Sequence, residues 1–157
     1  MFSSFFLVAL SKGQIAPDFS AKNQSGKMVN LKDFRGKPVV LFFYPKDETP
    51  GCTKEACSFR DQFSKLKDLG AVVFGISKQD EKSHRAFIQN HKLPFDLLVD
   101  DGSISKAYGI PEIPLTGILM RRSALIDAQG KIARVYESVD PTTHVEEVIQ
   151  DIKTLIN

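Results

Sequence analysis

The stretch "KPVVLFFYPKDETPGCTKEACSFRD" (residues 37–61) contains an apolar run, the start of a helix and both cysteines of the chain. Residues 37–45 are continuously apolar and rich in valine and phenylalanine, which predicts a central strand buried on both faces of a sheet. From Pro50 onward, apolar residues recur at steps of three and four. This spacing predicts an amphipathic helix that begins near Thr49 or Pro50 and is closed by Gly70.

The rest of the chain continues an α/β pattern. A buried strand, a polar helix and a short strand are predicted in turn at residues 71–77, 80–91 and 96–100. Two extended runs within 117–137 are joined by a hairpin signal at 127–130, and a closing helix follows Pro141. Upstream, turn signals at 23–26 predict an added N-terminal β-hairpin. We therefore expect an α/β fold in which helices flank both faces of a mixed central sheet.

Composition narrows the class of protein. With 157 residues and 42% hydrophobic content, the chain is expected to form one domain, 1–157, with a core of its own. The formal charge of +2 comes from interspersed residues of both signs, which argues against a nucleic-acid partner. Two cysteines are too few for a disulfide framework.

The N-terminus, residues 1–11, is an extension of uncertain role. Its apolar run from Phe5 to Leu10 is too short to span a membrane, which takes about 20 residues. A signal peptide would carry positive charge before the run, whereas the first basic residue, Lys12, follows it. We expect a first strand or a disordered end and a cytoplasmic protein; export is the alternative.

Cys52 lies in the first turn of the predicted helix. Unpaired N–H groups and the positive end of the helix dipole favour a thiolate over a thiol there. Ionising an ordinary thiol at neutral pH takes about 2 kcal/mol, whereas a helix terminus supplies about 0.3 to 1 kcal/mol. The sequence therefore predicts a second source of positive charge, an arginine close to the sulfur.

Cys57 follows Cys52 by five residues, an awkward spacing for a disulfide. In an unbroken helix the two residues point about 140° apart, with Cα atoms about 8.6 Å from one another. A disulfide needs a Cα separation below about 7 Å, so the first turns would have to unwind. The spacing therefore argues against a structural disulfide. It favours a transient disulfide that forms on oxidation and that a reductant breaks again.

Simpler interpretations of these cysteines stay open. Free cysteines are often small buried hydrophobes, a role that suits Cys57 as well as a redox role does. Cys52 follows a Pro-Gly pair among polar residues and suits it poorly. A zinc site is disfavoured because no histidine or further cysteine lies near the pair, and no metal or cofactor is expected. We interpret the three histidines as surface residues: His84, His91 and His144.

Four segments resemble the peroxiredoxins, and among them the peroxiredoxin Q or bacterioferritin comigratory protein branch. They are "APDF" (16–19), "PKDETPGCTKEACSFRD" (45–61), "RRSALID" (121–127) and "HVEEVI" (144–149). The similarity runs from about Lys12 to the end. It implies a thioredoxin-like fold and a thiol peroxidase that reduces hydrogen peroxide and organic hydroperoxides.

The resemblance implies roles for Cys52 and for two residues before it. Cys52 would be the peroxidatic cysteine, attacking the outer peroxide oxygen and becoming a sulfenic acid. Thr49 would hydrogen-bond the thiolate and the peroxide, cap the helix, or do both. Pro45 would shield the thiolate from water, although a proline at this position commonly does no more than end the strand.

By the same resemblance, Arg121 would be the missing arginine. It would hold the sulfur charged and polarise the O–O bond as charge builds on the leaving oxygen; on residue type alone it is a strand-surface arginine. Arg122 points to the other side of the strand and is expected to face elsewhere. Glu55 matches a position that orients the arginine, and its alternative is a solvated carboxylate favoured by the helix dipole.

Cys57 resembles the resolving cysteine of the C-x4-C form of that branch. It would attack the sulfenic acid and leave an intramolecular disulfide, which thioredoxin or a glutaredoxin-like reductant would reduce. Because both cysteines lie in one chain, we expect a monomer. Ala124 departs from the pattern, which usually has an aromatic residue there, and this bears on the packing behind Arg121 and on the peroxide entrance.

Two other functions compete with a peroxidase. A thiol–disulfide exchange protein shares the implied fold, but such proteins usually carry C-x-x-C, whose sulfurs meet without unwinding. A non-catalytic binding or chaperone module is also compatible, because a fold does not dictate function. The second alternative predicts nothing special for Cys52.

Overall fold

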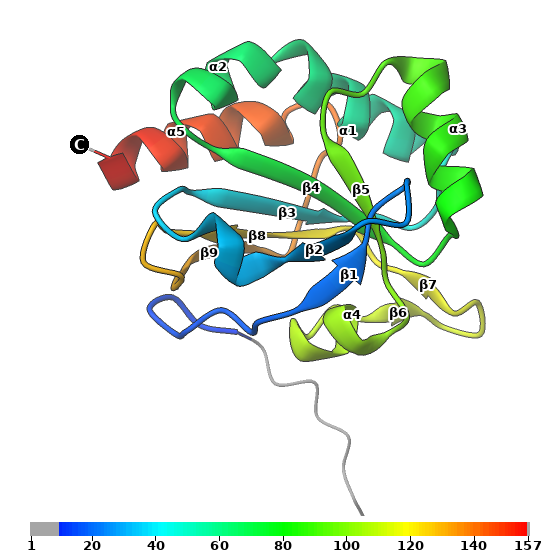
Figure 1. Cartoon of the computed structure of the whole chain (residues 1–157), viewed down its shortest axis with the longest axis horizontal. Helices are drawn as coiled ribbons and strands as arrows, with labels where there is room; N and C mark the ends of the chain where they lie inside the picture. The colour runs from blue at the N-terminus through cyan, green and yellow to red at the C-terminus, as the bar shows by residue number, and fades with distance from the viewer. Residues whose placement is uncertain (1–9, 157) are drawn as a thin grey trace, which may run out of the picture.

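The computed structural model describes residues 10–156, which surround a five-stranded mixed sheet (Figure 1). From edge to edge the strands are β5 (Asp96–Val99), β4 (Val72–Ser77), β3 (Val39–Phe43), β8 (Arg122–Ile126) and β9 (Ile132–Tyr136). The first three are parallel, and β8 and β9 run antiparallel to their neighbours. The predicted central strand is confirmed, since β3 lies in the middle and all its residues are buried.

The remaining elements divide between the two faces of the sheet. One face packs against α1 (Pro50–Asp61), α2 (Phe63–Asp68), α3 (Glu81–His91) and α5 (His144–Ile156). The other carries the hairpin of β1 (Ser20–Lys22) and β2 (Met28–Asn30), the short helix η1 (Leu31–Phe34), and α4 (Ser103–Ala107). A separate hairpin is formed by β6 (Glu112–Ile113) and β7 (Ile118–Leu119). The predicted mixed sheet, its helices and its N-terminal hairpin are confirmed.

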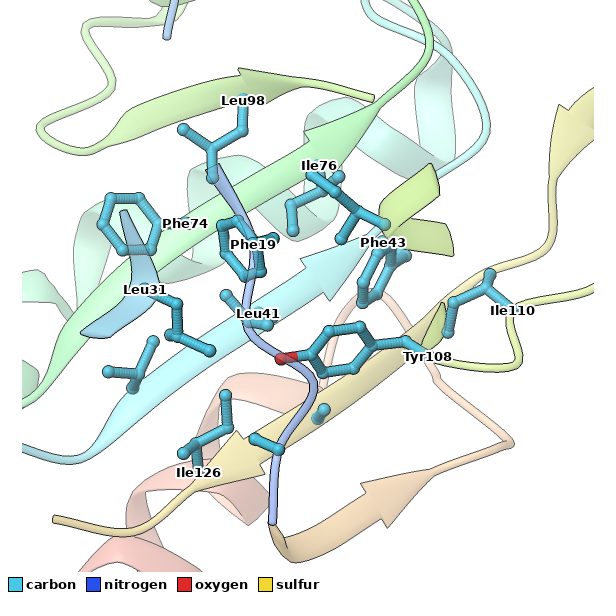
Figure 2. Close-up of a cluster of buried hydrophobic side chains, with 14 of the residues drawn as sticks. Phe19, Leu31, Leu41, Phe43, Phe74, Ile76, Leu98, Tyr108, Ile110 and Ile126 are labelled. Atoms are coloured by element: carbon cyan, nitrogen blue, oxygen red, sulfur yellow. The ribbon is translucent and has the colours of Figure 1, made fainter. Parts of the chain in front are cut away.

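Strand β3 divides the core into two clusters. Leu41 and Phe43 point into the cluster under the N-terminal hairpin, where Phe43 lies near the ring of Tyr108 (Figure 2). Val40 and Phe42 point into the cluster under the helices, where Phe42 stacks on a phenylalanine of α1. This alternation is what the period of a strand buried on both faces requires.

One long helix was expected after Pro50, and the structure has two. The break is at Gln62, with φ −103° and ψ 8°. The sequence pattern hides it because apolar residues on both sides, Phe59 and Leu66, pack into the same cluster. Gly70 does end the pattern as predicted: its φ is +78°, and Ala71 N–H donates to the Leu66 carbonyl at 3.0 Å, closing a Schellman motif.

The extended run expected from residue 117 is also divided. Strand β7 pairs with β6, whereas β8 pairs with β3, and Met120 and Arg121 lie between them. The hairpin of β6 and β7, the helix α4 and the helix η1 were not predicted. The two strands of the hairpin have two residues each, and the two helices have five and four, all too short for a periodic pattern to mark.

Two histidines expected on the surface are buried. His84 has no exposed surface and His144 has 3%; His91 keeps 24% of its side-chain surface. His84 lies three residues before Phe87, on the inward face of α3, and His144 bonds the Ser123 hydroxyl at 2.8 Å. The prediction that they lie on the surface is wrong because it rests on residue type, whereas the position of a side chain on its helix decides its burial.

The predictions for residues 1–9 lie outside the described part of the chain. Leu10, the first described residue, is buried in the cluster under the N-terminal hairpin. Within residues 10–156, no helix has both the length and the apolar character needed to cross a membrane.

We predict that Gly75→Ala lowers the free energy of unfolding by about 1–3 kcal/mol through overpacking. A β-carbon at this buried position of β4 would lie 2.6 Å from Leu97 Cδ2 and 2.7 Å from Phe42 Cζ. Phe42 cannot retreat freely, because its ring stacks on Phe59 with centroids 4.8 Å apart. Urea denaturation measures the loss.

Leu97→Val, which removes the nearer clashing atom, provides the control. The double variant should lose less stability than the two single variants together. A Gly75→Ala protein as stable as the wild type would contradict the close packing.

Candidate active site

The loop between β3 and α1 crosses the carboxyl end of the central strand. Helix α1 begins at Pro50, and Thr49 precedes it with extended backbone angles, φ −78° and ψ 152°. Cys52 is therefore the third helical residue, as the sequence predicted. It therefore belongs to the first turn, whose N–H groups have no partner within the helix. Its side chain is almost fully buried.

Arg121 reaches this helix end from β8, the strand next to β3. Strand β8 lies antiparallel to β3 with Arg122 opposite Phe43, so the residue just before β8 falls at the carboxyl end of β3. Arg121 Nη2 lies 3.3 Å from the sulfur of Cys52, and Nη1 lies 2.7 Å from Glu55 Oε1. The structure thus brings together three of the six predicted residues around one guanidinium.

Gly51 makes room for this guanidinium. A β-carbon on Gly51 would lie 3.0 Å from Nη2 of Arg121, which is tighter than almost all real contacts of that kind. The Pro-Gly pair before Cys52 therefore starts the helix and also allows the arginine to approach it closely.

Glu55 is fully buried, which corrects the alternative of a solvated carboxylate. Arg121 binds only one of its oxygens, and Oε2 has no partner among the described residues. Burial raises the pKa of Glu55 to about 7, against the opposing effect of Arg121. Burial alone would lower the pKa of Arg121, but Glu55 and Cys52 together raise it. The guanidinium is a permanent cation between a sulfur and a carboxyl group.

The other predicted residues take different places. The Thr49 hydroxyl donates to the Lys46 carbonyl at 2.8 Å, and the side chain makes no capping bond to α1. Among the described residues no hydrogen bond joins Thr49 to Cys52. Pro45 is half-buried where the loop leaves the sheet, and its carbonyl accepts a bond from Gln79 at 3.3 Å. Both residues line the same loop without contacting the sulfur through a hydrogen bond.

Cys57 is a free, half-buried thiol in the same helix as Cys52. Burial raises the pKa of the Cys57 thiol, and the nearby Arg60 guanidinium partly offsets this. Because α1 is continuous from Pro50 to Asp61, the two cysteines face directions about 140° apart. A bond between them requires the start of α1 to unwind.

Ala124 does not lie behind Arg121. It is buried in the cluster under the N-terminal hairpin, opposite Leu41 of β3, on the face of the sheet that Arg122 also shares. Because side chains alternate along β8, Arg121 belongs to the opposite side. The departure from the aromatic pattern therefore affects the other core and leaves the packing of Arg121 untouched.

Within residues 10–156, no group of three or more histidine, cysteine, aspartate or glutamate side chains is placed to hold a metal ion. The site consists of a sulfur, a guanidinium and a carboxyl group.

Comparison with known proteins points to one family. Residues 12–135 match the AhpC/TSA family. Chloroplastic peroxiredoxin Q of Triticum aestivum is 45% identical over 148 residues, which covers 93% of this chain and 68% of that protein. The chloroplastic peroxiredoxin Q of Arabidopsis thaliana is 46% identical over 146 residues, covering 92% of this chain and 68% of the relative.

Solved structures of similar proteins share the fold. Peroxidoxin BcpB of Mycobacterium tuberculosis is 30% identical with a TM-score of 0.85, covering 93% of this chain and 98% of that one. A cysteine-to-serine variant of peroxiredoxin Q from Xylella fastidiosa is 26% identical with a TM-score of 0.88, covering 96% and 99%. The bacterioferritin comigratory protein of Xanthomonas campestris is 26% identical with a TM-score of 0.84, covering 92% and 98%.

We predict that Glu55 makes the protein less stable as the pH rises from about 4.5 to 7. Its pKa in the folded protein, about 7, lies above the ordinary value of 4.5, so its contribution is complete below pH 4.5 and is lost as the pH approaches 7. The loss is about 3 kcal/mol at most, since each tenfold change in ionisation is worth about 1.4 kcal/mol.

Glu55→Gln isolates this effect, because glutamine can still accept the bond from Arg121 but does not titrate. Thermal unfolding of both proteins between pH 4.5 and 8 measures it, with the difference between them as the signal. Parallel pH profiles for the two proteins would show that Glu55 ionises as an ordinary carboxyl group.

Proposed function

The chain belongs to the AhpC/TSA family, in its peroxiredoxin Q branch of peroxidases, and we propose that Cys52 is the cysteine that the hydroperoxide oxidises and Cys57 the one that resolves it. The family reduces peroxides by cysteine chemistry. One observation carries the assignment of Cys52: its sulfur lies in the first turn of α1, 3.3 Å from the guanidinium of Arg121.

In the proposed first step, the Cys52 thiolate attacks the outer oxygen of a hydroperoxide. The S–O bond forms as the O–O bond breaks, so the sulfur becomes a sulfenic acid while the leaving oxygen takes a proton and departs as water or an alcohol. Arg121 stabilises the thiolate before the reaction and the negative charge on the leaving oxygen during it. Glu55 positions the guanidinium through its bond to Nη1.

Thr49 and Pro45 complete the proposed site from the loop. The Thr49 hydroxyl already donates its hydrogen to the Lys46 carbonyl, so its oxygen is available to accept a bond from the incoming hydroperoxide. Pro45, half-buried where the loop leaves the sheet, is the residue proposed to limit the access of water to the sulfur. Both roles depend on the loop staying in place during the reaction.

In the proposed second step, the Cys57 thiolate attacks the sulfur of the sulfenic acid; the S–S bond forms as the S–O bond breaks, and the hydroxide takes a proton and leaves as water. The start of α1 unwinds for this step, because the helix keeps the two cysteines apart. Thioredoxin or a glutaredoxin-like protein then returns two electrons. The proposed enzyme is a cytoplasmic protein of one domain. It works as a monomer, since both cysteines come from the same chain.

The proposed substrates are hydrogen peroxide and organic hydroperoxides. The Xanthomonas campestris relative is described with alkyl peroxide reduction activity, which supports the organic class. The nearly complete burial of Cys52 favours small or slender hydroperoxides over bulky ones.

We predict that Cys52→Ser abolishes peroxide consumption in the presence of thioredoxin, thioredoxin reductase and NADPH. Cys57→Ser should consume about one equivalent of peroxide, form a sulfenic acid and then stall, because the resolving thiol is missing. A steady-state assay and a single-turnover assay separate the two effects. Unchanged peroxide removal by Cys52→Ser would refute the proposal; insulin reduction without peroxide turnover would instead identify a thiol–disulfide exchange protein.

We predict that Arg121→Lys slows the reaction of Cys52 with hydrogen peroxide by about 100-fold to 1,000-fold, the range for losing one donor of a charge-stabilising site. Lysine keeps the charge but cannot contact the sulfur and Glu55 together. Stopped-flow measurement with limiting peroxide gives the rate constant. Arg122→Lys, on the other face of β8, is the matched control and should react like the wild type; equal rates for both variants would remove Arg121 from the mechanism.

A further inference from the structure

A buried polar cluster lies directly behind the loop that leads into α1. Asp47, only 4% exposed, accepts hydrogen bonds from the Tyr44 hydroxyl at 2.5 Å and the Ser83 hydroxyl at 2.7 Å. Nδ1 of His84 lies 2.7 Å from the same carboxylate. Because Ser83 and His84 belong to α3, the carboxylate of Asp47 ties the loop to that helix.

His84 has an acceptor at each ring nitrogen. Nδ1 faces the Asp47 carboxylate, and Nε2 lies 3.0 Å from the Leu98 carbonyl of β5. Both side chains of the pair are out of contact with water, at 0% exposure for His84 and 1% for Asp47. Removing one of them leaves buried polar atoms of the other without a hydrogen-bond partner, which is costly.

A second, exposed pair joins the next residue of the loop to the same helix. Glu48, with a left-handed φ of +66°, accepts a bond from Asn90 at 2.8 Å and lies 3.0 Å from Nε2 of His91. At the far end of α1, Arg60 donates to the His91 carbonyl at 2.7 Å. Helix α3 thus contacts the chain on both sides of the turn that holds Cys52.

We propose that Asp47 and His84 are a positioning pair that fixes residues 45–49 on α3 and thereby keeps Cys52 beside Arg121. Neither residue forms a hydrogen bond to the sulfur. Both act through the backbone of the loop, in which Asp47 lies five residues before Cys52. One consequence rests on the proposed function: since α1 must open for the disulfide step, the pair favours the peroxide step and restrains the disulfide step.

Hydrogen exchange tests the positioning without any peroxide chemistry. In the reduced protein, His84→Gln should raise the amide exchange rates of residues 46–55 at least 10-fold and leave those of β8 and β9 unchanged. Asp47→Asn, which keeps the size of the side chain, should do the same and serves in its place if His84→Gln does not fold. Exchange at 46–55 within twofold of the wild type in a folded variant would overturn the proposal.

Rate measurements then test the consequence. In His84→Gln the reaction of Cys52 with hydrogen peroxide should slow at least 10-fold, while the following disulfide step should be as fast as in the wild type or faster. A general loss of stability would not slow one step and spare the next. Faster exchange at 46–55 together with no oxidation of Cys52 in the wild type would uphold the positioning pair and refute the proposed function.

Two controls separate the pair from other changes. His91→Gln breaks the exposed pair with Glu48 and should alter both rates less than threefold, since exposed ion pairs contribute little. Tyr108→Phe removes a buried hydrogen bond to the Pro17 carbonyl at 2.7 Å on the other face of the sheet and reports the effect of destabilisation alone. If Tyr108→Phe reproduces the split between the two rates, the pair has no positioning role.

Discussion

The site depends on one guanidinium that is shared by two groups on the same helix turn. Cys52 and Glu55 are three residues apart in α1 and so face the same side, and Arg121 contacts both. The arginine arrives there only because β8 pairs with β3 in a register that sets Arg122 opposite Phe43. A slip of one residue would turn Arg121 to the other face of the sheet and leave the sulfur without its cation.

Local patterns predicted the part of this arrangement that one segment can encode. A continuous apolar run marked β3, and Pro50 with its following period marked the start of α1, so that Cys52 fell in the first turn. The position of Arg121 could not be predicted from any one segment. Sixty-six residues separate it from Glu55, and only the resemblance to a family connected them. Strand register brings such distant residues together, and it cannot be predicted from the hydrophobic period of either segment.

Polar residues whose partners are distant in sequence were the ones that pattern reasoning placed wrongly. The prediction that His84 and His144 lie on the surface is wrong, and nothing in the sequence pattern indicates that Glu55 and Asp47 are buried. A polar side chain is buried at little cost only when hydrogen-bond partners compensate it, and the Asp47 partner of His84 lies 37 residues away. Where that partner is unknown, a polar residue in an amphipathic helix looks solvated even when its helical position points inward.

The proposed function places two opposed demands on helix α1. An intact first turn holds Cys52 beside Arg121, whereas the proposed disulfide with Cys57 requires that same turn to open. The division of the helix at Gln62 lets both be met, because α2 is fixed separately by buried Leu66 and by the Schellman motif at Gly70. Phe59, stacked on Phe42, holds the far end of α1 in the core. An opening confined to the turns before Phe59 releases buried Ala56 and the bond between Arg121 and Glu55, while Phe59 and the sheet stay in place.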